Sequence, residues 1–260
     1  MTPAYTVKTH AKFPDDSKAI KGIIQLHDIE TGELLAIMDS SYLTAVRTGL
    51  AGALGTHTLS RKEAKNVAIV GSGVQGRTQL KSLSYFRSIS RVYVFDTNSQ
   101  NSIKFVDEMS KELKTSFIIC ERLEEALMDA DIIITATWSK VPFIYPEMIK
   151  EGTHITTLGA DQPGKFEVSP NVLGQSVIVC DDVELGHRMG VLQDKKLKES
   201  IFNVYELGEV LGSQRCGRAD SNQTTIFGCV GLAFQDLIIA WEVFQKAVKN
   251  DVGSFFEFHK

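Results

Sequence analysis

Hydrophobic positions change their spacing along the first sixty residues. Residues 5–13, 21–29 and 33–39 are rich in β-branched and other apolar residues, and the turn-forming sequence ETGE at 30–33 separates the last two segments. From residue 40 to 59 the period becomes helical, because Leu43, Val46, Leu50 and Leu54 recur three to four positions apart. The pattern predicts three strands followed by a helix.

Short apolar runs alternate with helical patterns from Asn66 onward. The predicted strands are 66–70, 91–96, 116–120, 131–137, 153–158 and 176–180, and the predicted helices include 74–86, 101–113, 123–130 and 146–151. Such alternation is typical of a parallel sheet covered on both faces, a Rossmann-type doubly wound α/β domain. After about Leu211 we expect no further strand. The spacing of apolar residues over 228–250 predicts one long amphipathic helix.

Composition and charge narrow the class of protein. The 260 residues are 43% hydrophobic and 23% charged, with a net charge of −4 and no basic run, which argues against nucleic acid or an anionic membrane as partner. The four cysteines are far apart, and the histidines show no metal spacing. No apolar stretch is long enough to span a membrane, and no signal core precedes the first strand. We expect a cytoplasmic protein without a bound metal.

A glycine motif lies between a predicted strand and a predicted helix. Gly71-x-Gly73-x-x-Gly76 would provide the tight turn, the close backbone approach to a pyrophosphate and the close helix–strand packing of a dinucleotide site. The next predicted strand ends in Asp96, whose carboxylate would bind the ribose hydroxyls and favour NAD over NADP. The alternative is a tight turn with an incidental aspartate.

Two domains follow from these patterns. Residues 59–220 are predicted to form the NAD-binding Rossmann domain. Residues 1–58 and 221–260 are predicted to form a smaller α+β domain for substrate binding and dimerisation.

Four ordered motifs resemble the ornithine cyclodeaminase/mu-crystallin family. They are the segment ETGELLAIMDSSYLTAVRTGLAGALGTHTLSR, the loop AIVGSGVQGRTQ, the segment LGADQPGKFEV and the tail GRADSNQTTIFGCVGLAFQD. The resemblance covers nearly the whole chain. It implies an NAD-dependent oxidoreductase or cyclodeaminase that acts on a small L-amino acid or its cyclic imine, and a homodimer.

The resemblance also implies roles for individual residues. Asp161 matches the catalytic acid/base, while Lys8 and Arg47 match the residues beside the substrate carboxylate, and Val230 lies near the substrate. The implied cofactor residues are Gly71, Gly73, Val74, Gln75, Gly76, Asp96, Thr44, Thr137, Leu158, Lys165 and Cys229. Cys229 stands where the family usually has serine, and a second carboxylate-binding arginine of the family has no counterpart in these residues.

Each catalytic candidate has a simpler explanation. Asp161 would also suit a turn cap between glycine and proline, Arg47 could extend from the edge of an apolar helix, and Lys8 could be an exposed strand lysine. Three activities remain open: a cyclodeaminase, an alanine-type amino-acid dehydrogenase or ketimine reductase, and a non-catalytic NAD(P)H-binding protein similar to mu-crystallin.

Overall fold

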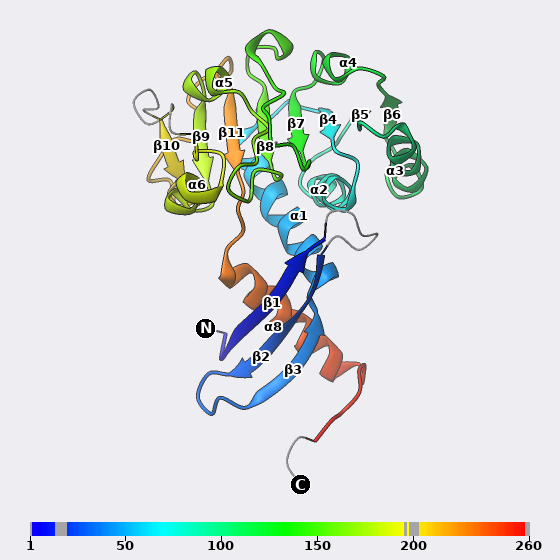
Figure 1. The fold of residues 1–260 in the computed structure, drawn as a ribbon, viewed down its shortest axis with the longest axis vertical. Coiled ribbons are helices and arrows are strands. Elements are labelled where there is room, and N and C mark those ends of the chain that lie inside the picture. The colour runs from blue at the N-terminus through cyan, green and yellow to red at the C-terminus, as the bar shows by residue number, and fades with distance from the viewer. Residues whose placement is uncertain (1, 14–19, 195–196, 198–202, 258–260) are drawn as a thin grey trace. The chain divides into compact units, whose positions relative to one another are not determined.

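The computed structural model describes residues 2–13, 20–194, 197 and 203–257, which belong to two compact units (Figure 1). The smaller unit combines Met1–Arg47 with Leu232–Lys260, and the larger unit is the intervening segment Thr48–Gly231. The predicted fold class, a Rossmann-type domain with a smaller domain built from both chain ends, is confirmed. The junctions expected at 58/59 and 220/221 both lie within the larger unit.

The smaller unit is an antiparallel sheet covered on one face by a helix. Its strands are β1 (Ala4–Lys12), β2 (Ile20–Asp28) and β3 (Leu34–Asp39), and its helix is α8 (Ala233–Lys249). Ile24 and Leu26 are fully buried and pack with Ala240 of α8. Ile23 and Gln25, which alternate with them on β2, point to the opposite face because side chains alternate along a strand. The predicted strands and the turn at 30–33 are confirmed.

The larger unit is built on a sheet of eight parallel strands, in the order β10-β9-β11-β8-β7-β4-β5-β6. The strands are β4 (Asn66–Val70), β5 (Arg91–Phe95), β6 (Ser116–Ile119), β7 (Ile132–Thr135), β8 (His154–Thr157), β9 (Val177–Cys180), β10 (Val204–Glu206) and β11 (Thr225–Gly228). The chain builds β4, β5 and β6 on one side and then crosses to β7 on the other side of β4. Doubly wound sheets bind ligands at such a reversal, beyond the carboxyl ends of the strands.

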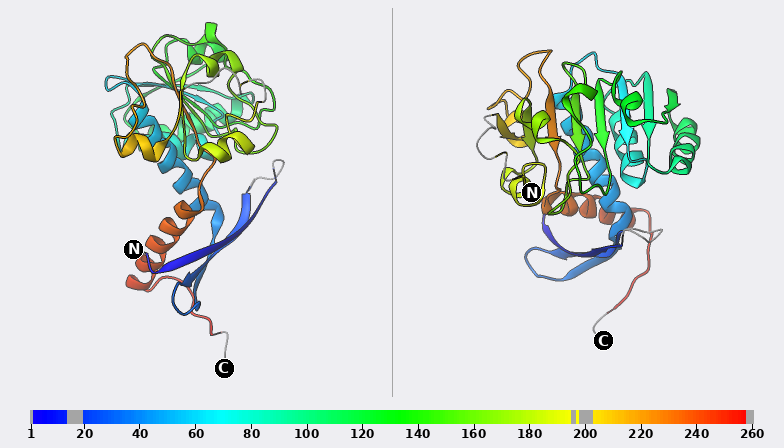
Figure 2. Two further views of the ribbon diagram at one scale, coloured as in Figure 1. Left: turned by 90° about the vertical axis from the view of Figure 1, so that its left-hand side faces the viewer. Right: turned by 45° about the horizontal axis from the view of Figure 1, so that its top comes forward.

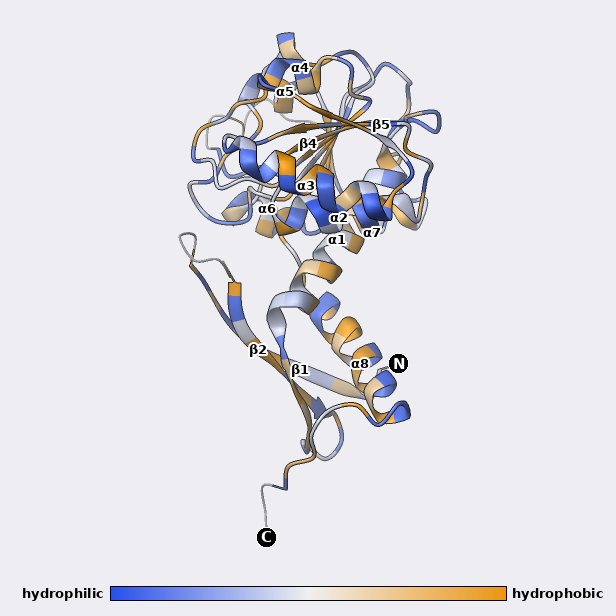
Figure 3. Cartoon of the chain, turned by 90° about the vertical axis from the view of Figure 1, so that its right-hand side faces the viewer, coloured by the Kyte–Doolittle hydropathy of each residue, from blue (hydrophilic) through white to orange (hydrophobic). Residues whose placement is uncertain are grey.

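Helices cover both faces of this sheet (Figure 2). One face packs against α1 (Ser40–Leu59), α2 (Val74–Ser84), α3 (Ser99–Glu112) and α7 (Leu207–Leu211), and the other against α4 (Leu123–Leu127), α5 (Pro170–Gly174) and α6 (Val183–Met189). Strands buried on both faces are mostly apolar, and β4 and β5 accordingly carry the hydrophobic colour over most of their length in Figure 3. The helix α1 begins in the smaller unit and continues into the larger one.

Three expectations from the sequence are wrong. Strand β11 follows Leu211 and lies inside the sheet between β8 and β9, where the β-branched Thr225 and Ile226 are fully buried. The last helix begins at Ala233 rather than at residue 228, because Gly231 adopts a φ of +94°, which interrupts a helix. The helix expected at 146–151 is a single 3-10 turn, Pro146–Met148.

Candidate functional site

The glycine motif forms a loop at the reversal of strand order. Gly71 has a φ of +92°, and a Cβ atom there would lie 2.5 Å from the Ala136 carbonyl oxygen, so only glycine fits. A Cβ atom at Gly76 would overlap the Gly71 carbonyl oxygen, whereas one at Gly73 would meet nothing within 4 Å. Helix α2 begins directly after Gly73 with no side-chain cap. Its first N–H groups and the open side of Gly73 therefore suit a pyrophosphate.

Asp96 follows β5 and is tied to this loop. Its Oδ2 accepts hydrogen bonds from the backbone N–H and the hydroxyl of Ser72, at 2.9 and 3.0 Å. Its Oδ1 accepts one from the backbone N–H of Asn98, at 2.9 Å. Thr97 and Asn98 carry no positive charge. The geometry matches a ribose-binding acid, and the two residues that follow Asp96 offer no cation to a 2′-phosphate.

Asp161 lies in the loop that follows β8. Its Oδ1 is 2.9 Å from Nζ of Lys165, and that ammonium group lies 4.5 Å from the centroid of the Trp138 ring. Lys165 is buried, and the Asp161 side chain is 26% exposed. Asp161 is thus an accessible carboxylate whose orientation is set by a buried cation.

Gln193 holds this loop in place from the segment after α6. Its Oε1 accepts a hydrogen bond from the backbone N–H of Gly164, at 2.7 Å. Its Nε2 donates to the carbonyl oxygens of Gln162 and Lys165, at 3.2 and 2.9 Å. The loop between Asp161 and Lys165 therefore has a fixed backbone, although it has no regular secondary structure.

Asp181, directly after β9, fixes the residues that follow β11. Its carboxylate accepts hydrogen bonds from the backbone N–H groups of Val230 and Gly231, at 3.0 and 2.6 Å. Burial raises the pKa of Asp181, and these backbone bonds oppose that shift. Cys229 is buried, and its Sγ lies 3.6 Å from Oδ2 of Asp181. Cys229 and Val230 are therefore held at the same edge of the sheet as Asp161.

The smaller unit contains a compact group of charges. Nζ of Lys8, on β1, and Nε of Arg47, on α1, lie 2.9 and 3.1 Å from the same oxygen of Asp236, on α8. All three side chains are at most 12% exposed. Burial lowers the pKa of Lys8 below its ordinary value, and its hydrogen bond to Asp236 offsets only part of that shift. We call Lys8, Arg47 and Asp236 the cation cluster.

The cation cluster carries a net charge of about +1, since one carboxylate lies between two cations. An uncompensated charge that is mostly removed from water favours binding of an anion. Thr44 lies one turn before Arg47 in α1, is 4% exposed, and its hydroxyl has no hydrogen-bond partner among the described residues. Such an orphaned group is suited to a ligand contact.

The predicted site residues thus form two separate groups. Lys8, Thr44 and Arg47 belong to the smaller unit. The remaining predicted residues follow the carboxyl ends of strands in the larger unit, namely Gly71, Gly73, Val74, Gln75, Gly76, Asp96, Thr137, Leu158, Asp161, Lys165, Cys229 and Val230. Sequence reasoning missed Asp181, Gln193, Asp236 and the buried Glu167.

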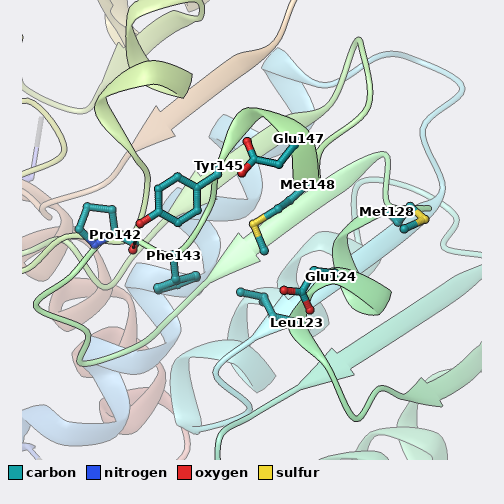
Figure 4. Close-up of a pocket in the computed structure, with 8 residues that line it drawn as sticks. All are labelled: Leu123, Glu124, Met128, Pro142, Phe143, Tyr145, Glu147 and Met148. Carbon is teal, nitrogen blue, oxygen red and sulfur yellow. Dashed lines mark hydrogen bonds between the residues drawn. The ribbon is translucent and has the colours of Figure 1, made fainter.

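A cavity in the larger unit lies away from these residues (Figure 4). It has a volume of about 470 Å³ and lies between α4 and the segment 142–148. Its lining includes Phe143, Tyr145 and Met148, and it contains none of the predicted site residues.

Across the described ranges we find no group of three or more potential metal ligands. Within the same ranges, no helix has the length and apolar character of a membrane span.

Comparison with known proteins identifies the family. Residues 2–251 match the model of the ornithine cyclodeaminase/mu-crystallin family. The chain belongs to this family. It is 31% identical over 247 residues to the Δ1-pyrroline-2-carboxylate reductase of Bacillus thuringiensis subsp. konkukian, covering 93% of this chain and 75% of the relative.

Two solved structures are also similar to this chain. An archaeal alanine dehydrogenase dimer with bound NAD superposes with a TM-score of 0.93 at 32% identity, covering 100% of this chain and 82% of that one. The Δ1-pyrroline-2-carboxylate reductase of Thermococcus litoralis, in complex with NADH and L-proline, superposes with a TM-score of 0.91 at 33% identity, covering 96% and 80%. This member of the family is therefore similar to NAD-dependent enzymes of amino-acid chemistry.

Proposed function

We propose that this protein catalyses NAD-dependent interconversion of a small L-amino acid and the corresponding imine, as a cyclic-imine reductase or amino-acid dehydrogenase. The observation that carries the proposal is the Asp161–Lys165 pair, held at the carboxyl ends of the strands in the unit that also contains the glycine loop. The similarity to a pyrroline-carboxylate reductase and an alanine dehydrogenase supports the same reaction class.

The larger unit would hold the dinucleotide. The glycine loop and the first N–H groups of α2 would bind the pyrophosphate, and Asp96 would bind the ribose. Thr137, Leu158, Lys165 and Cys229 would line the nicotinamide end. Bound NAD supplies the acceptor for a hydride from Cα, and NADH supplies the hydride in the reverse direction.

The substrate carboxylate would bind the cation cluster. Lys8 and Arg47 together exceed the charge of Asp236 by one, so an α-carboxylate restores neutrality. This interaction would orient the amino acid through a group that does not react. It would apply equally to acyclic and cyclic substrates, since both carry the carboxylate.

Asp161 would transfer the proton. Oxidation of the Cα–N bond removes a hydride from Cα and a proton from the ammonium group, and the carboxylate of Asp161 is the accessible base in the larger unit's loop. In the direction of reduction the same group would return the proton to nitrogen. Lys165 would keep the carboxylate oriented through their 2.9 Å contact.

A cyclodeaminase is the second candidate, because the family includes ornithine cyclodeaminases. In that reaction a side-chain amine attacks the iminium carbon, ammonia leaves, and the hydride returns.

The assay that separates the candidates supplies NAD(H) with the standard L-amino acids, L-ornithine, and five- and six-membered cyclic imino acids. Net change in NADH absorbance supports a dehydrogenase or reductase, whereas ammonia and proline without net NADH support a cyclodeaminase. Tight NADH binding with neither product would identify a non-catalytic binder and refute the proposal.

We predict that NAD(H) binds at least about tenfold more tightly than NADP(H), which corresponds to about 1.4 kcal/mol. The reason is the carboxylate of Asp96, which is fixed beside the loop and repels a 2′-phosphate. Titration of both reduced nucleotides by fluorescence measures the ratio. Asp96→Asn should reduce the ratio of the NAD(H) affinity to the NADP(H) affinity. Equal affinities for the two nucleotides in the unchanged protein would contradict the role of Asp96.

We also predict a homodimer built on the sheet of the smaller unit. The face of this sheet opposite α8 exposes Tyr5, Val7, Ile23 and Ile37, each at least 39%. An apolar sheet face of this kind favours burial against a partner, and the similar alanine dehydrogenase is a dimer. Light scattering should give twice the chain mass of 28.8 kDa. Ile37→Glu should produce monomers, whereas Ile103→Glu, at a similarly exposed position on α3, should not.

A further inference from the structure

Glu167 is a carboxylate with five hydrogen-bond donors at the end of the Asp161 loop. It is 1% exposed. Its Oε2 accepts hydrogen bonds from the hydroxyls of Thr135 and Thr157, both at 2.7 Å, and from the backbone N–H of Gly159, at 3.0 Å. Its Oε1 accepts from the backbone N–H and the hydroxyl of Thr137, at 2.8 and 2.7 Å.

Stability alone does not explain a charge at this position. Removing a carboxylate from water is costly, and a well-packed apolar side chain is often at least as stabilising as a buried charge. The ion pairs of the described residues do not include Glu167, so its hydrogen bonds offset the cost of burial. A buried carboxylate with five donors instead fixes the positions of the groups that donate to it.

Those groups lie where the two loops of the proposed site begin. Thr135 ends β7, and the loop that follows it contains Trp138. Thr157 ends β8, and the loop that follows it contains Asp161 and Lys165. A Cβ atom at Gly159 would overlap Oε1 of Glu167, so the backbone approaches the carboxylate as closely as glycine permits.

The main chain of Glu167 is anchored as well. Its carbonyl oxygen accepts hydrogen bonds from the backbone N–H groups of Phe143 and Ile144, at 3.0 and 3.1 Å. Both ends of the loop from Gly159 to Glu167 are therefore fixed. The Glu167 carboxylate binds the backbone N–H of Gly159 at the start, and the Glu167 carbonyl binds two backbone N–H groups at the end. The contacts of Lys165 with Asp161 and Trp138 lie between these two anchors.

We infer that Glu167 is a positioning residue, which sets the spacing of Asp161, Lys165 and Trp138 without contacting the substrate. The predicted effect of Glu167 on turnover rests on the proposed function. Its structural consequence, a change in the surroundings of Trp138, is independent of any activity.

Glu167→Gln is an informative substitution because every partner of the carboxylate is a donor. A threonine hydroxyl can rotate to accept a hydrogen bond from the new amide, but a backbone N–H cannot. Whichever way the amide is turned, its NH₂ group faces either the Thr137 or the Gly159 N–H, in place of an acceptor. One end of a site loop should therefore shift, with little change in side-chain volume.

Asp131→Asn provides a matched control. Asp131 precedes β7, at the amino end of the sheet, and its Oδ2 accepts hydrogen bonds from the backbone N–H groups of Lys65 and Asn66, at 3.1 and 3.0 Å. The asparagine oxygen can keep both backbone bonds, so its NH₂ group faces the cations of Arg61 and Lys150, which lie 3.0 and 2.9 Å from Oδ1 of Asp131. This change also sets an amide against donors, but at the amino end of the sheet, away from the strand ends that carry Asp161. Both variants should lose stability.

The first measurement is steady-state kinetics with the best substrate found in the screen, normalised to folded protein. Glu167→Gln should lower kcat roughly tenfold, with little change in KM or in NADH affinity, because misplacement of reacting groups by a fraction of an ångström lowers turnover more than binding. Asp131→Asn should keep kcat within about twofold. An unchanged kcat in Glu167→Gln, or equal losses in both variants, would overturn the positioning role.

The second measurement needs no substrate. Trp138 and Trp241 are the two tryptophans, so Trp241→Phe leaves Trp138 as the sole indole reporter. In that background Glu167→Gln should change the emission and acrylamide quenching of Trp138, and Asp131→Asn should not. If Glu167→Gln does not fold, Thr157→Val removes one donor and tests the same shift. A protein without turnover would refute the proposed function alone, whereas unaltered Trp138 fluorescence would refute the role of Glu167.

Discussion

Replacement of Asp161 by asparagine is expected to lower kcat by about 10²–10⁴-fold, the usual contribution of a general acid–base group. Asparagine keeps the shape of the side chain and its ability to cap a turn, but it cannot take the substrate proton. The loop backbone is held independently by Gln193, so the fold should be retained. Single-turnover and steady-state rates measure turnover, NADH titration measures cofactor affinity, and thermal unfolding measures stability.

The pattern of these measurements distinguishes the alternatives for Asp161. Lost turnover with retained melting temperature and NADH affinity identifies the acid/base. Turnover within a few-fold of the unchanged protein would make Asp161 a turn residue, and loss of NADH binding would place its carboxylate in the cofactor site. Asp107→Asn, on the exposed face of α3, controls for the loss of one negative charge.

Replacement of Arg47 by methionine is expected to lower kcat/KM by roughly 10- to 150-fold, the range for a lost hydrogen bond to a charged group. The change removes the excess positive charge, because Lys8 and Asp236 alone are neutral. The α-carboxylate then has no net attraction to the cluster. The loss should appear mainly as a raised KM for the amino acid, with NADH affinity unchanged.

Arg61→Met is the matched control for Arg47→Met. Arg61 also pairs with a largely buried aspartate, since its Nη2 lies 3.0 Å from Asp131, but the pair lies outside both groups of predicted site residues. Arg61→Met should leave the KM for the amino acid within about twofold of the value for the unchanged protein. If Arg47→Met retains the KM of the unchanged protein, the cation cluster is a structural ion pair and the substrate carboxylate binds elsewhere.

Features with local causes could be predicted from the sequence. The glycine loop is encoded within six residues, and the structure shows that sterics require glycine at Gly71 and Gly76. The alternation of strands and helices likewise predicted the doubly wound sheet. Asp96 was predicted from its place at the end of a strand, and it does lie against the loop.

Features with long-range causes could not be predicted. Glu167 follows Lys165 and Phe166 in a short polar–apolar alternation, and nothing in that pattern shows that five donors from two strand ends surround it. Asp236 resembles an ordinary charge in the first turn of α8, whereas its partner Lys8 is 228 residues away in sequence. Strand β11 is only four residues long and precedes a helical pattern, so the periodicity of that pattern obscured it.

The insertion of the larger unit has a consequence for synthesis of the protein. Strand β3 ends at Asp39 and α8 begins at Ala233, so the ribosome adds 193 residues between them. At about 5–20 residues per second this takes roughly 10–40 s. Throughout that interval Ile24 and Leu26 lack the helix that buries them in the finished protein, while the larger unit can already fold. The nascent N-terminal sheet therefore exposes this apolar face for as long as the larger unit is being synthesised, and premature termination before α8 leaves the face uncovered permanently.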